Sequence, residues 1–313
     1  MKQDWKPELI QQISQIIPEE RIMEQEPMRN HTTFRVGGPA SLFLELCSEQ
    51  ELSRVLALLK REQEDYYLIG NGSNLLVSDT GYQGVILHLA KDFNRVTIER
   101  EQENCLICEA GASLASIART ACEHGLTGFE FAAGIPGTLG GAIVMNAGAY
   151  GGEMKQVVKS VRLMTPEGAI VEKSCEEMDF SYRHSILKEQ DYHSFIVLRV
   201  TIALQPGEKQ DIKEKMEELA GKRREKQPLE YPSAGSTFKR PEGYFAAKLI
   251  DDTGLRGFQV GGAQVSEKHC GFVINKDNAT ATDIYKLMQE VKEKVRQKFG
   301  VTLEPEVILL GKF

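Results

Sequence analysis

The segment from Phe131 to Gly152 reads FAAGIPGTLGGAIVMNAGAYGG and carries no charged residue over 22 positions. This length is close to the ~20 predominantly apolar residues that a membrane-spanning helix needs. Seven of the positions are glycine, however, and Pro136 and Asn146 interrupt the rest. Because glycine loses much backbone entropy in a helix, the segment is a poor helix former. The pattern predicts backbone that folds closely against another part of the molecule, and no membrane span.

The segment contains one glycine-rich loop, GIPGTLGG at residues 134–141, and a second such loop occurs earlier. The second is Gly70-Asn71-Gly72-Ser73-Asn74, which directly follows the apolar run Tyr66–Ile69. In loops of this kind successive backbone N–H groups can converge on one point and bind phosphate without a lysine. Either loop alone is more often a plain turn. Two of them in one module favour a dinucleotide ligand.

Neither common nucleotide-binding motif matches these loops. A Rossmann fingerprint that starts at Gly70 requires a glycine at position 75, which is Leu75. The chain also contains no GxxxxGK[ST] motif, because Met216 stands where the first glycine should precede Gly221-Lys222. The loops therefore indicate nucleotide phosphates held by some other fold.

Composition limits the class of protein. The chain has 313 residues and a mass of 35.0 kDa, which suggests two or three domains. Hydrophobic residues make up 41% and charged residues 27%, which excludes wholesale disorder. The net charge is −7 and the pI about 5.6, so nothing favours a nucleic-acid partner. Residues 1–205 carry 19 basic and 28 acidic residues, whereas residues 206–313 carry 19 and 17, so the second part would tolerate an anionic ligand.

The cysteines and the N-terminal residues favour the cytoplasm. Six cysteines are scattered along the chain, and Met1–Lys6 is charged where a secretory signal needs an apolar core. Cys105-Leu106-Ile107-Cys108 resembles half of a zinc site, but no second pair of ligands completes it. We expect two reduced cysteines in a strand and no bound metal.

Periodicity and capping residues predict the secondary structure. Expected helices are Leu9–Ile17, a helix after the Ser48/Glu51 capping box, one after Ser113 that ends near Gly125, the charged segment 207–226, and Ile284–Val295 ending at Gly300. Expected strands are 42–46, 66–69, 85–89, 96–99, 105–109, 161–164, 195–204, 272–274 and 307–310. Helices and strands mix without strict alternation, which favours an α+β fold. The main domain boundary is expected within residues 206–226.

Three polar clusters are candidates for reaction chemistry. They are SYRHS at 181–185, SAGSTFKRP at 233–241 and LEPEV at 303–307. By residue type alone, a structural explanation is favoured for each: a turn for the first two and a surface carboxylate pair for the third. Ser236–Lys239 also matches the S-x-x-K motif of penicillin-binding enzymes, but Ser185–Lys188 does too, and S-D-N and K-T-G are missing. We attribute that match to chance. The histidines form no H-E-x-x-H motif.

Taken together and in order, these motifs resemble one known family. TFRVGG at 33–38, GNGSN, GIPGTLGG followed by NAGAYGGE, SYRHS, AGSTFKRP, GGAQVSEKH and the closing EPEV are similar to the UDP-N-acetylenolpyruvoylglucosamine reductase (MurB) family. The resemblance extends from about Asn30 to Val307. The short interval between GAYGGE and SYRHS resembles the shorter branch of the family.

The resemblance implies an α+β fold in three parts. Two subdomains, residues 1–90 and 91–206, form an FAD-binding module of the vanillyl-alcohol oxidase/p-cresol methylhydroxylase type. A smaller substrate-binding domain, residues 207–313, returns its last strand toward the flavin. The implied activity is NADPH-dependent reduction of the enolpyruvyl double bond of UDP-N-acetylenolpyruvoylglucosamine, which gives UDP-N-acetylmuramate for peptidoglycan. FAD is non-covalent and NADPH a co-substrate, and we expect a cytoplasmic monomer without nucleic-acid or membrane partners.

The resemblance also implies roles for individual residues. Ser236 matches the proton donor, Arg183 the arginine that activates the substrate, and Glu306, in preference to Glu304, the catalytic glutamate. Residues that match cofactor-binding positions are Gly70, Asn71, Gly72, Ser73, Asn74, Leu75, Gly134, Ile135, Pro136, Gly137, Thr138, Gly140, Gly141 and Arg223. Those that match substrate contacts are Tyr150, Tyr182, Lys239 and His269.

Two other functions stay open at this point. An FAD-dependent oxidase of the same fold would share the glycine loops but would pass electrons to O₂. It would need neither NADPH nor the pair Ser236 and Glu306. A non-catalytic nucleotide-binding module would leave the three polar clusters without a role and would not be yellow.

Overall fold

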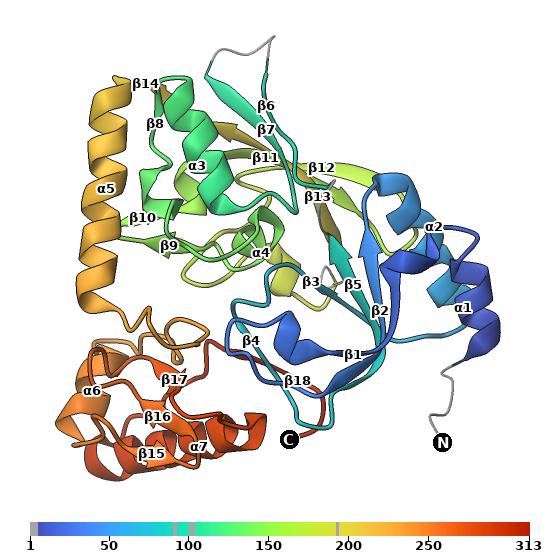
Figure 1. Ribbon diagram of the computed structural model, residues 1–313. Helices are drawn as coiled ribbons and strands as arrows, with labels where there is room; N and C mark the ends of the chain where they lie inside the picture. Colours follow the sequence, from blue (N-terminus) through green and yellow to red (C-terminus); the bar gives the residue numbers. More distant parts are fainter. Residues whose placement is uncertain (1–5, 90–92, 100–103, 192–193) are drawn as a thin grey trace. The chain divides into compact units, whose positions relative to one another are not determined.

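The computed structural model describes residues 6–89, 93–99, 104–191 and 194–313 (Figure 1). The chain forms two compact units. The first comprises Met1–Ile22, Leu44–Gly70 and Leu87–Lys222, and the second comprises Met23–Phe43, Asn71–Ile86 and Arg223–Phe313. The expected boundary between residues 90 and 91 lies outside the described residues.

The helices are α1 (Pro7–Ile13), α2 (Glu49–Arg61), α3 (Leu114–Glu123), α4 (Leu139–Val144), α5 (Lys209–Lys226), α6 (Ala246–Asp252) and α7 (Ala281–Phe299). The longer strands are β1 (Ile22–Pro27), β2 (Pro39–Leu46), β3 (Tyr66–Ile69), β4 (Leu75–Val77), β5 (Tyr82–Leu89), β6 (Val96–Ile98), β7 (Cys105–Glu109), β11 (Val158–Met164), β12 (Ile170–Ser174), β13 (Ile196–Ala203), β16 (Ala263–Val265), β17 (Val273–Asn275) and β18 (Ile308–Leu310). Two-residue strands are β8 (Leu126–Thr127), β9 (Gly148–Ala149), β10 (Gly152–Glu153), β14 (Gln205–Pro206) and β15 (Gln259–Val260).

Capping residues fix the ends of three predicted helices. Ser48 accepts a hydrogen bond from the Glu51 N–H at the start of α2, and Ser113 accepts one from the Ser116 N–H at the start of α3. The Glu51 carboxylate accepts from the Cys47 N–H (2.8 Å) instead of completing a capping box with Ser48. Helix α7 ends at Gly300, whose φ of +70° is the left-handed conformation expected of a C-terminal glycine. These three helix predictions are confirmed.

Two helices, α4 and α6, were not expected from the sequence. Residues 139–144 lie inside the glycine-rich segment, yet they form α4. Leu139, Ala142 and Ile143 are buried, and a Cβ on Gly140 would lie 3.2 Å from the Ala110 Cβ. Burial of this apolar face and close approach to Ala110 offset the entropic cost of the glycines. The stretch was expected to be a poor helix former, and six of its residues form a helix through these contacts.

The first unit contains a five-stranded antiparallel sheet with the strand order β12-β11-β13-β7-β6. Helix α4 packs against β13 and β7 of this sheet (Figure 1). Its strand β7 carries Cys105 and Cys108, which are buried and form no disulfide, in agreement with the expected strand. Burial raises the pKa of Cys108 to about 12, so this thiol is unreactive at neutral pH. A further sheet has the strand order β1-β2-β5-β3.

The second unit is built around α7. The antiparallel sheet β15-β16-β17 packs on α7, as does α6 (Figure 1). Strand β18 pairs in parallel with β4, so the last strand of the chain joins a strand that is more than 200 residues earlier. Buried side chains of α7, including Ile284, Leu287 and Met288, form one core with Phe34 and Leu76.

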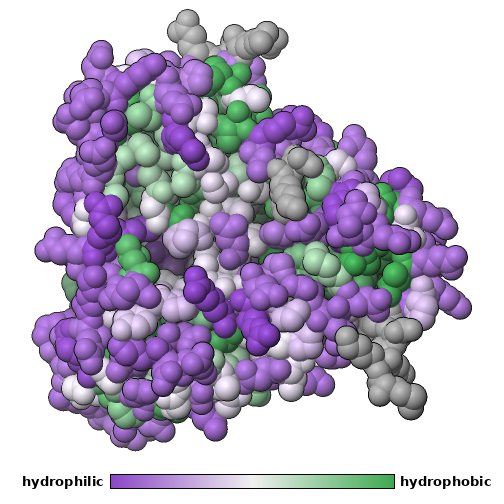
Figure 2. Space-filling model, in the orientation of Figure 1, coloured by the Kyte–Doolittle hydropathy of each residue, from purple (hydrophilic) through white to green (hydrophobic). Residues whose placement is uncertain are grey.

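The visible face of the molecule is mainly hydrophilic, and its apolar patches are small (Figure 2). Among the more exposed large apolar side chains are Tyr182, Tyr244 and Phe245. In the part of the chain that the structure describes, no helix has both the length and the apolar character needed to cross a bilayer.

Candidate active site

Ser236 and Glu306 lie on neighbouring segments of the second unit. The Glu306 N–H donates a hydrogen bond to the Thr237 carbonyl (2.9 Å), and the Lys239 N–H donates to the Glu304 carbonyl (2.9 Å). The two segments thus pair like antiparallel strands, with a bridge between Phe238 and Pro305. This pairing brings together two of the three polar clusters that the sequence indicated.

Thr237 anchors the exposed Ser236. Its N–H donates to the Gly271 carbonyl (2.8 Å), its Oγ1 accepts from the Val273 N–H (2.9 Å), and its side chain is fully buried. On the other side of Ser236, Gly235 has a φ of +73°, which favours glycine. The serine is therefore held on a fixed backbone while its side chain stays accessible.

Lys239 makes an ion pair with Glu304 (3.1 Å) at the surface. The Glu304 side chain is 71% exposed, so this pair contributes little to stability. Glu306, two residues later, is more enclosed. The two acids of this segment therefore have different environments. Glu304 pairs with Lys239 at the surface, whereas Glu306 is partly enclosed.

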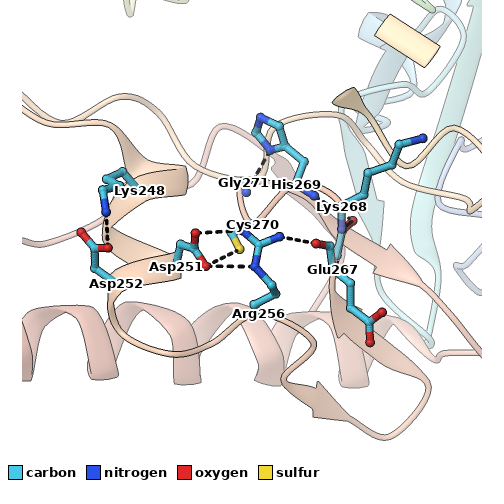
Figure 3. A network of polar contacts seen from close by, with 10 residues as sticks. Lys248, Asp251, Asp252, Arg256, Glu267, Lys268, His269, Cys270 and Gly271 are labelled. Atoms are coloured by element: carbon cyan, nitrogen blue, oxygen red, sulfur yellow. Dashed lines mark hydrogen bonds and ion pairs between the residues drawn. The ribbon is translucent and has the colours of Figure 1, made fainter. Parts of the chain in front are cut away.

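His269 lies on a loop whose backbone is held by its neighbours (Figure 3). Arg256 donates two hydrogen bonds to Asp251 (3.0 and 2.8 Å) and a third to the Glu267 carbonyl. The Cys270 thiol donates to the same Asp251 carboxylate (3.5 Å). These contacts fix both sides of His269, and the Gly271 carbonyl connects the loop to Thr237.

Local contacts set the protonation state of His269. Burial and the nearby Arg256 guanidinium hold the pKa of this imidazole below its ordinary value of 6.5. Its Nδ1 lies 3.1 Å from the Gly271 N–H and accepts a hydrogen bond from it (Figure 3). A neutral ring with the proton on Nε2 satisfies this contact. The Nε2–H group of His269 is then the side chain's hydrogen-bond donor.

The loop at 71–74 is tied to the segment that carries Glu306. The Asn74 side-chain amide donates to the Glu306 carbonyl (2.9 Å), and the Ile308 N–H donates to the Asn74 carbonyl (2.9 Å). Leu75 begins β4 and pairs with Ile308 of β18. A cofactor loop and a catalytic segment therefore share one hydrogen-bonded framework in the second unit.

The same loop approaches the His31–Thr33 segment closely. Gly72 has a φ of +56°, and a Cβ at this position would lie 2.0 Å from the His31 carbonyl oxygen. The Gly72 carbonyl accepts hydrogen bonds from the N–H groups of Thr33 and Leu75 (both 3.4 Å). Within the described residues, the backbone N–H groups of Asn71, Ser73 and Asn74 donate to no protein acceptor. Free amides in a glycine turn can bind an anion.

In the first unit, the glycine loops meet at Gly70 and Thr138. A Cβ on Gly70 would lie 2.1 Å from the Thr138 Oγ1, so only glycine fits there. The 134–141 loop is anchored by backbone hydrogen bonds from Leu139 to Ala112 (2.9 Å) and from Gly140 to Ala110 (2.8 Å). The two loops that the sequence singled out therefore make direct contact.

Tyr182 and Arg183 stand at the tip of a tight turn in the first unit. Ser181 and His184 exchange backbone hydrogen bonds (3.2 and 3.1 Å), and the Arg183 guanidinium lies over the Tyr182 ring, 5.2 Å from its centroid. Arg183 has a φ of +55° and Tyr150 a φ of +54°. Non-glycine residues in this region are strained, and such strain occurs most often at functional sites.

A fully buried asparagine supports this region. The Asn146 Nδ2 donates to the Ser181 carbonyl (3.0 Å) and to Glu153 (3.1 Å), and its Oδ1 accepts from the Lys155 N–H (2.9 Å). It thus connects the NAGAYGGE segment to the turn that carries Arg183. Sequence reasoning gave Asn146 no role, although an asparagine in an uncharged, mainly apolar run was the available signal.

The remaining predicted residues divide between the two units. Arg223 lies half-buried in the last turn of α5, in the second unit, with Asn71–Leu75, Ser236, Lys239, His269 and Glu306. Gly70, Gly134–Gly141, Tyr150, Tyr182 and Arg183 belong to the first unit. Within the described chain, no group of three or more His, Cys, Asp or Glu residues is placed to hold a metal ion.

A charged cavity of about 220 Å³ lies elsewhere in the first unit. Arg162, Arg199 and Glu109 occupy directly opposed positions on β11, β13 and β7 and line it. Glu49 at the start of α2 contacts both Arg162 (3.2 Å) and Arg199 (3.7 Å). These alternating charges form a row of ion pairs between sheet and helix, and none of the predicted site residues lines the cavity.

Two family models match the chain. Residues 40–174 match the FAD binding domain, and residues 227–310 match the C-terminal domain of UDP-N-acetylenolpyruvoylglucosamine reductase. The UDP-N-acetylenolpyruvoylglucosamine reductase of Caldanaerobacter subterraneus subsp. tengcongensis is 51% identical over 303 residues, which cover 97% of this chain and 98% of that protein. The chain belongs to the UDP-N-acetylenolpyruvoylglucosamine reductase family.

Solved structures agree with the membership in this reductase family. The UDP-N-acetylenolpyruvylglucosamine reductase (MurB) from Thermus caldophilus has a TM-score of 0.78 and 34% identity, over 92% of this chain and 98% of that one. An alkyldihydroxyacetonephosphate synthase, 15% identical, has a TM-score of 0.51 over 64% of this chain and 41% of that one, which reflects the fold alone. The expected fold class, an FAD-binding module with a separate C-terminal domain, is confirmed.

The residues present fit FAD, the cofactor expected for this family. The backbone N–H groups of Asn71, Ser73 and Asn74, which have no protein acceptor, are suited to bind a pyrophosphate. The turn admits no side chain at Gly72. Gly70 is equally restricted by Thr138. The chain therefore offers unpaired backbone donors in a turn that glycines hold against neighbouring protein segments.

Proposed function

We propose that this chain reduces the enolpyruvyl double bond of UDP-N-acetylenolpyruvoylglucosamine with NADPH and gives UDP-N-acetylmuramate for peptidoglycan synthesis. The observation that supports this most directly is the hydrogen bond from the Glu306 N–H to the Thr237 carbonyl. It joins the segment of the accessible Ser236 to the segment of the partly enclosed Glu306. An oxidase on the same fold has no need of this pair.

Each proposed catalytic residue has one task. Bound FAD supplies hydride transfer, from NADPH and then to the terminal carbon of the double bond. Negative charge then develops on the adjacent carbon and its carboxylate, and the Arg183 guanidinium would stabilise it. Glu306, when protonated, would donate a hydrogen bond to the same charge. Preorganised donors of this kind each lower a barrier by about 3–4 kcal/mol.

Ser236 completes the reduction by delivering a proton from its Oγ to the substrate carbon. A hydroxyl is a weak acid, but the carbon that it protonates is strongly basic, so positioning matters more than a matched pKa. The anchored backbone at Thr237 supports this positioning. Lys239 on the same segment would steady the transient alkoxide, and Tyr150, Tyr182 and His269 would contact the substrate.

We extend the proposal to the organisation and setting of the protein. The FAD subdomains would be residues 1–90 and 91–206, and the substrate domain residues 207–313. The protein would act as a monomer in the cytoplasm, with NADPH and the UDP-sugar as its partners.

The test uses the purified full-length protein under anaerobic conditions. It should be yellow, NADPH should bleach the flavin absorbance, and UDP-N-acetylenolpyruvoylglucosamine should restore it. Oxygen uptake driven by an alcohol, without reoxidation by the UDP-sugar, would favour the oxidase. A colourless protein that takes up no FAD would contradict both flavoenzyme functions and favour a non-catalytic nucleotide-binding module.

A further inference from the structure

The turn that carries Arg183 has a strained backbone. Arg183 has a φ of +55°, and the turn is closed by two backbone hydrogen bonds between Ser181 and His184 (3.2 and 3.1 Å). A residue with a side chain keeps such a conformation only where the surrounding structure enforces it. The Arg183 turn therefore depends on support from other parts of the first unit.

Two side chains hold the backbone on the N-terminal side of this turn. The Asn146 Nδ2 donates a hydrogen bond to the Ser181 carbonyl (3.0 Å), the same oxygen that accepts a hydrogen bond within the turn. The Lys155 Nζ donates to the Phe180 carbonyl (3.2 Å). Two consecutive carbonyls shortly before Arg183 are thus each held by a side-chain donor.

The two donors belong to one hydrogen-bonded arrangement. The Asn146 side chain is fully buried, and its Oδ1 accepts a hydrogen bond from the Lys155 N–H (2.9 Å). Asn146 also follows α4 closely, and its own N–H donates to the Ile143 carbonyl of that helix (3.2 Å). Helix α4 begins within the glycine loop at 134–141. Asn146 therefore connects a loop proposed to bind FAD with the turn that carries Arg183, within the first unit.

From these contacts we infer that Asn146 and Lys155 are positioning residues for Arg183 in the reaction. They act through Arg183, whose backbone they hold so that its guanidinium meets the negative charge that develops on the substrate. The inference rests on the proposed function. Because a displacement of about 1 Å can cost a reaction roughly 100-fold in rate, the support of this turn should matter for one chemical step and not for the fold alone.

The test measures both half-reactions of full-length, FAD-loaded variants by stopped-flow absorbance. Asn146→Gly removes the side-chain contacts, and glycine tolerates the φ of +41° at this position. It should slow reoxidation of the flavin by UDP-N-acetylenolpyruvoylglucosamine about 10- to 100-fold, and bleaching by NADPH by less than about threefold. The exposed Lys155 gives a milder pair of variants. Lys155→Met should slow reoxidation by roughly threefold or more, and Lys155→Arg, which keeps a donor, should restore the rate.

A double-mutant cycle separates positioning from general damage to the fold. If Asn146 acts through Arg183, Asn146→Gly should slow reoxidation no further in an Arg183→Ala background, because two changes that remove one interaction are not additive. Glu109→Gln is the matched control, since Glu109 is also buried in the first unit and pairs there with Arg95 (3.0 Å). It should lower the melting temperature without slowing reoxidation more than bleaching.

Three results would overturn the inference. The first is equal slowing of both half-reactions by Asn146→Gly, and the second is the same further slowing in the Arg183→Ala background as in the wild type. The third is reoxidation at the wild-type rate in Lys155→Met, which decides the matter if Asn146→Gly does not fold. If the UDP-sugar failed to reoxidise the reduced flavin of the wild type, the proposed function itself would fail, which is a separate result.

Discussion

The side-chain amide of Asn74 donates a hydrogen bond to the backbone carbonyl of Glu306, at 2.9 Å and across 232 residues of sequence. The first residue ends a glycine loop proposed to bind the cofactor, and the second is the proposed catalytic glutamate. The pairing of β4 with β18 begins directly after this contact. The position of Glu306 therefore depends on the same loop that would position FAD.

Asn74→Ala should slow reoxidation of the flavin by the UDP-sugar about 10- to 100-fold, because small displacements of a catalytic group are costly. Reduction by NADPH should slow much less. Stopped-flow absorbance separates the two half-reactions. Asn30→Ala, which removes an exposed asparagine bonded to Glu26, is the matched control and should leave both rates unchanged. Equal slowing of both half-reactions in Asn74→Ala would contradict this prediction, because it would mean that Asn74 affects the cofactor and has no separate effect on Glu306.

Ser236→Ala should leave bleaching of the flavin by NADPH nearly intact and slow its reoxidation by the UDP-sugar by roughly 100-fold or more. The physical reason is that the proposed proton transfer occurs only in the second half-reaction. The side chain is exposed, so the substitution should leave folding unaffected. Stopped-flow traces in which both half-reactions are impaired alike would contradict the role of Ser236 as proton donor.

Elements with strong local signals were predicted well from sequence. Ser48 and Ser113 cap the helices expected there, and Tyr66–Ile69 and Cys105–Glu109 are strands with the expected bounds. These features depend on neighbours in the chain. Helix α4 was missed because its stability depends on a buried apolar face and on close approach to Ala110, which glycine content alone does not reveal.

The candidate site was predicted only in part. Its motifs were recognised individually, but no spacing rule shows that Glu306 pairs with Thr237 or that Asn74 contacts Glu306, since these contacts join segments more than 60 and 200 residues apart. Asn146 was missed for a related reason. Its importance lies in the partners of a buried polar side chain, which only the folded structure decides.

Gly72→Ala should yield protein with little or no bound FAD. The added Cβ would meet the His31 carbonyl at 2.0 Å in a left-handed backbone, so the loop must move. Gly254→Ala is the matched control, because Gly254 also has a positive φ (+81°) but has no atom within 4 Å of the added Cβ. It should lose about 1 kcal/mol of stability and keep its flavin. The ratio of flavin to protein absorbance after purification decides between them, and full flavin occupancy in Gly72→Ala would remove this loop from the binding site.

His269 should make the stability of the protein depend on pH below neutrality. Its pKa in the folded protein lies below the ordinary 6.5, because of burial and the Arg256 charge. Between the folded pKa and 6.5, the unfolded chain binds more protons than the folded one, so stability rises with pH in that window. The contribution is therefore complete above pH ~6.5 and declines as the pH falls toward the folded value.

His269→Gln removes this titration, since glutamine carries no ionisable proton. The melting temperature of the wild type should fall more steeply than that of the variant as the pH is lowered from ~6.5, whereas the two curves should run parallel above pH ~7. A constant offset between the curves does not matter, because only their slopes are compared. Identical slopes below pH ~6.5 would mean that the ring is as easily protonated in the folded protein as in the unfolded chain. The hydrogen bond from the Gly271 N–H to Nδ1 would then fail to keep His269 neutral.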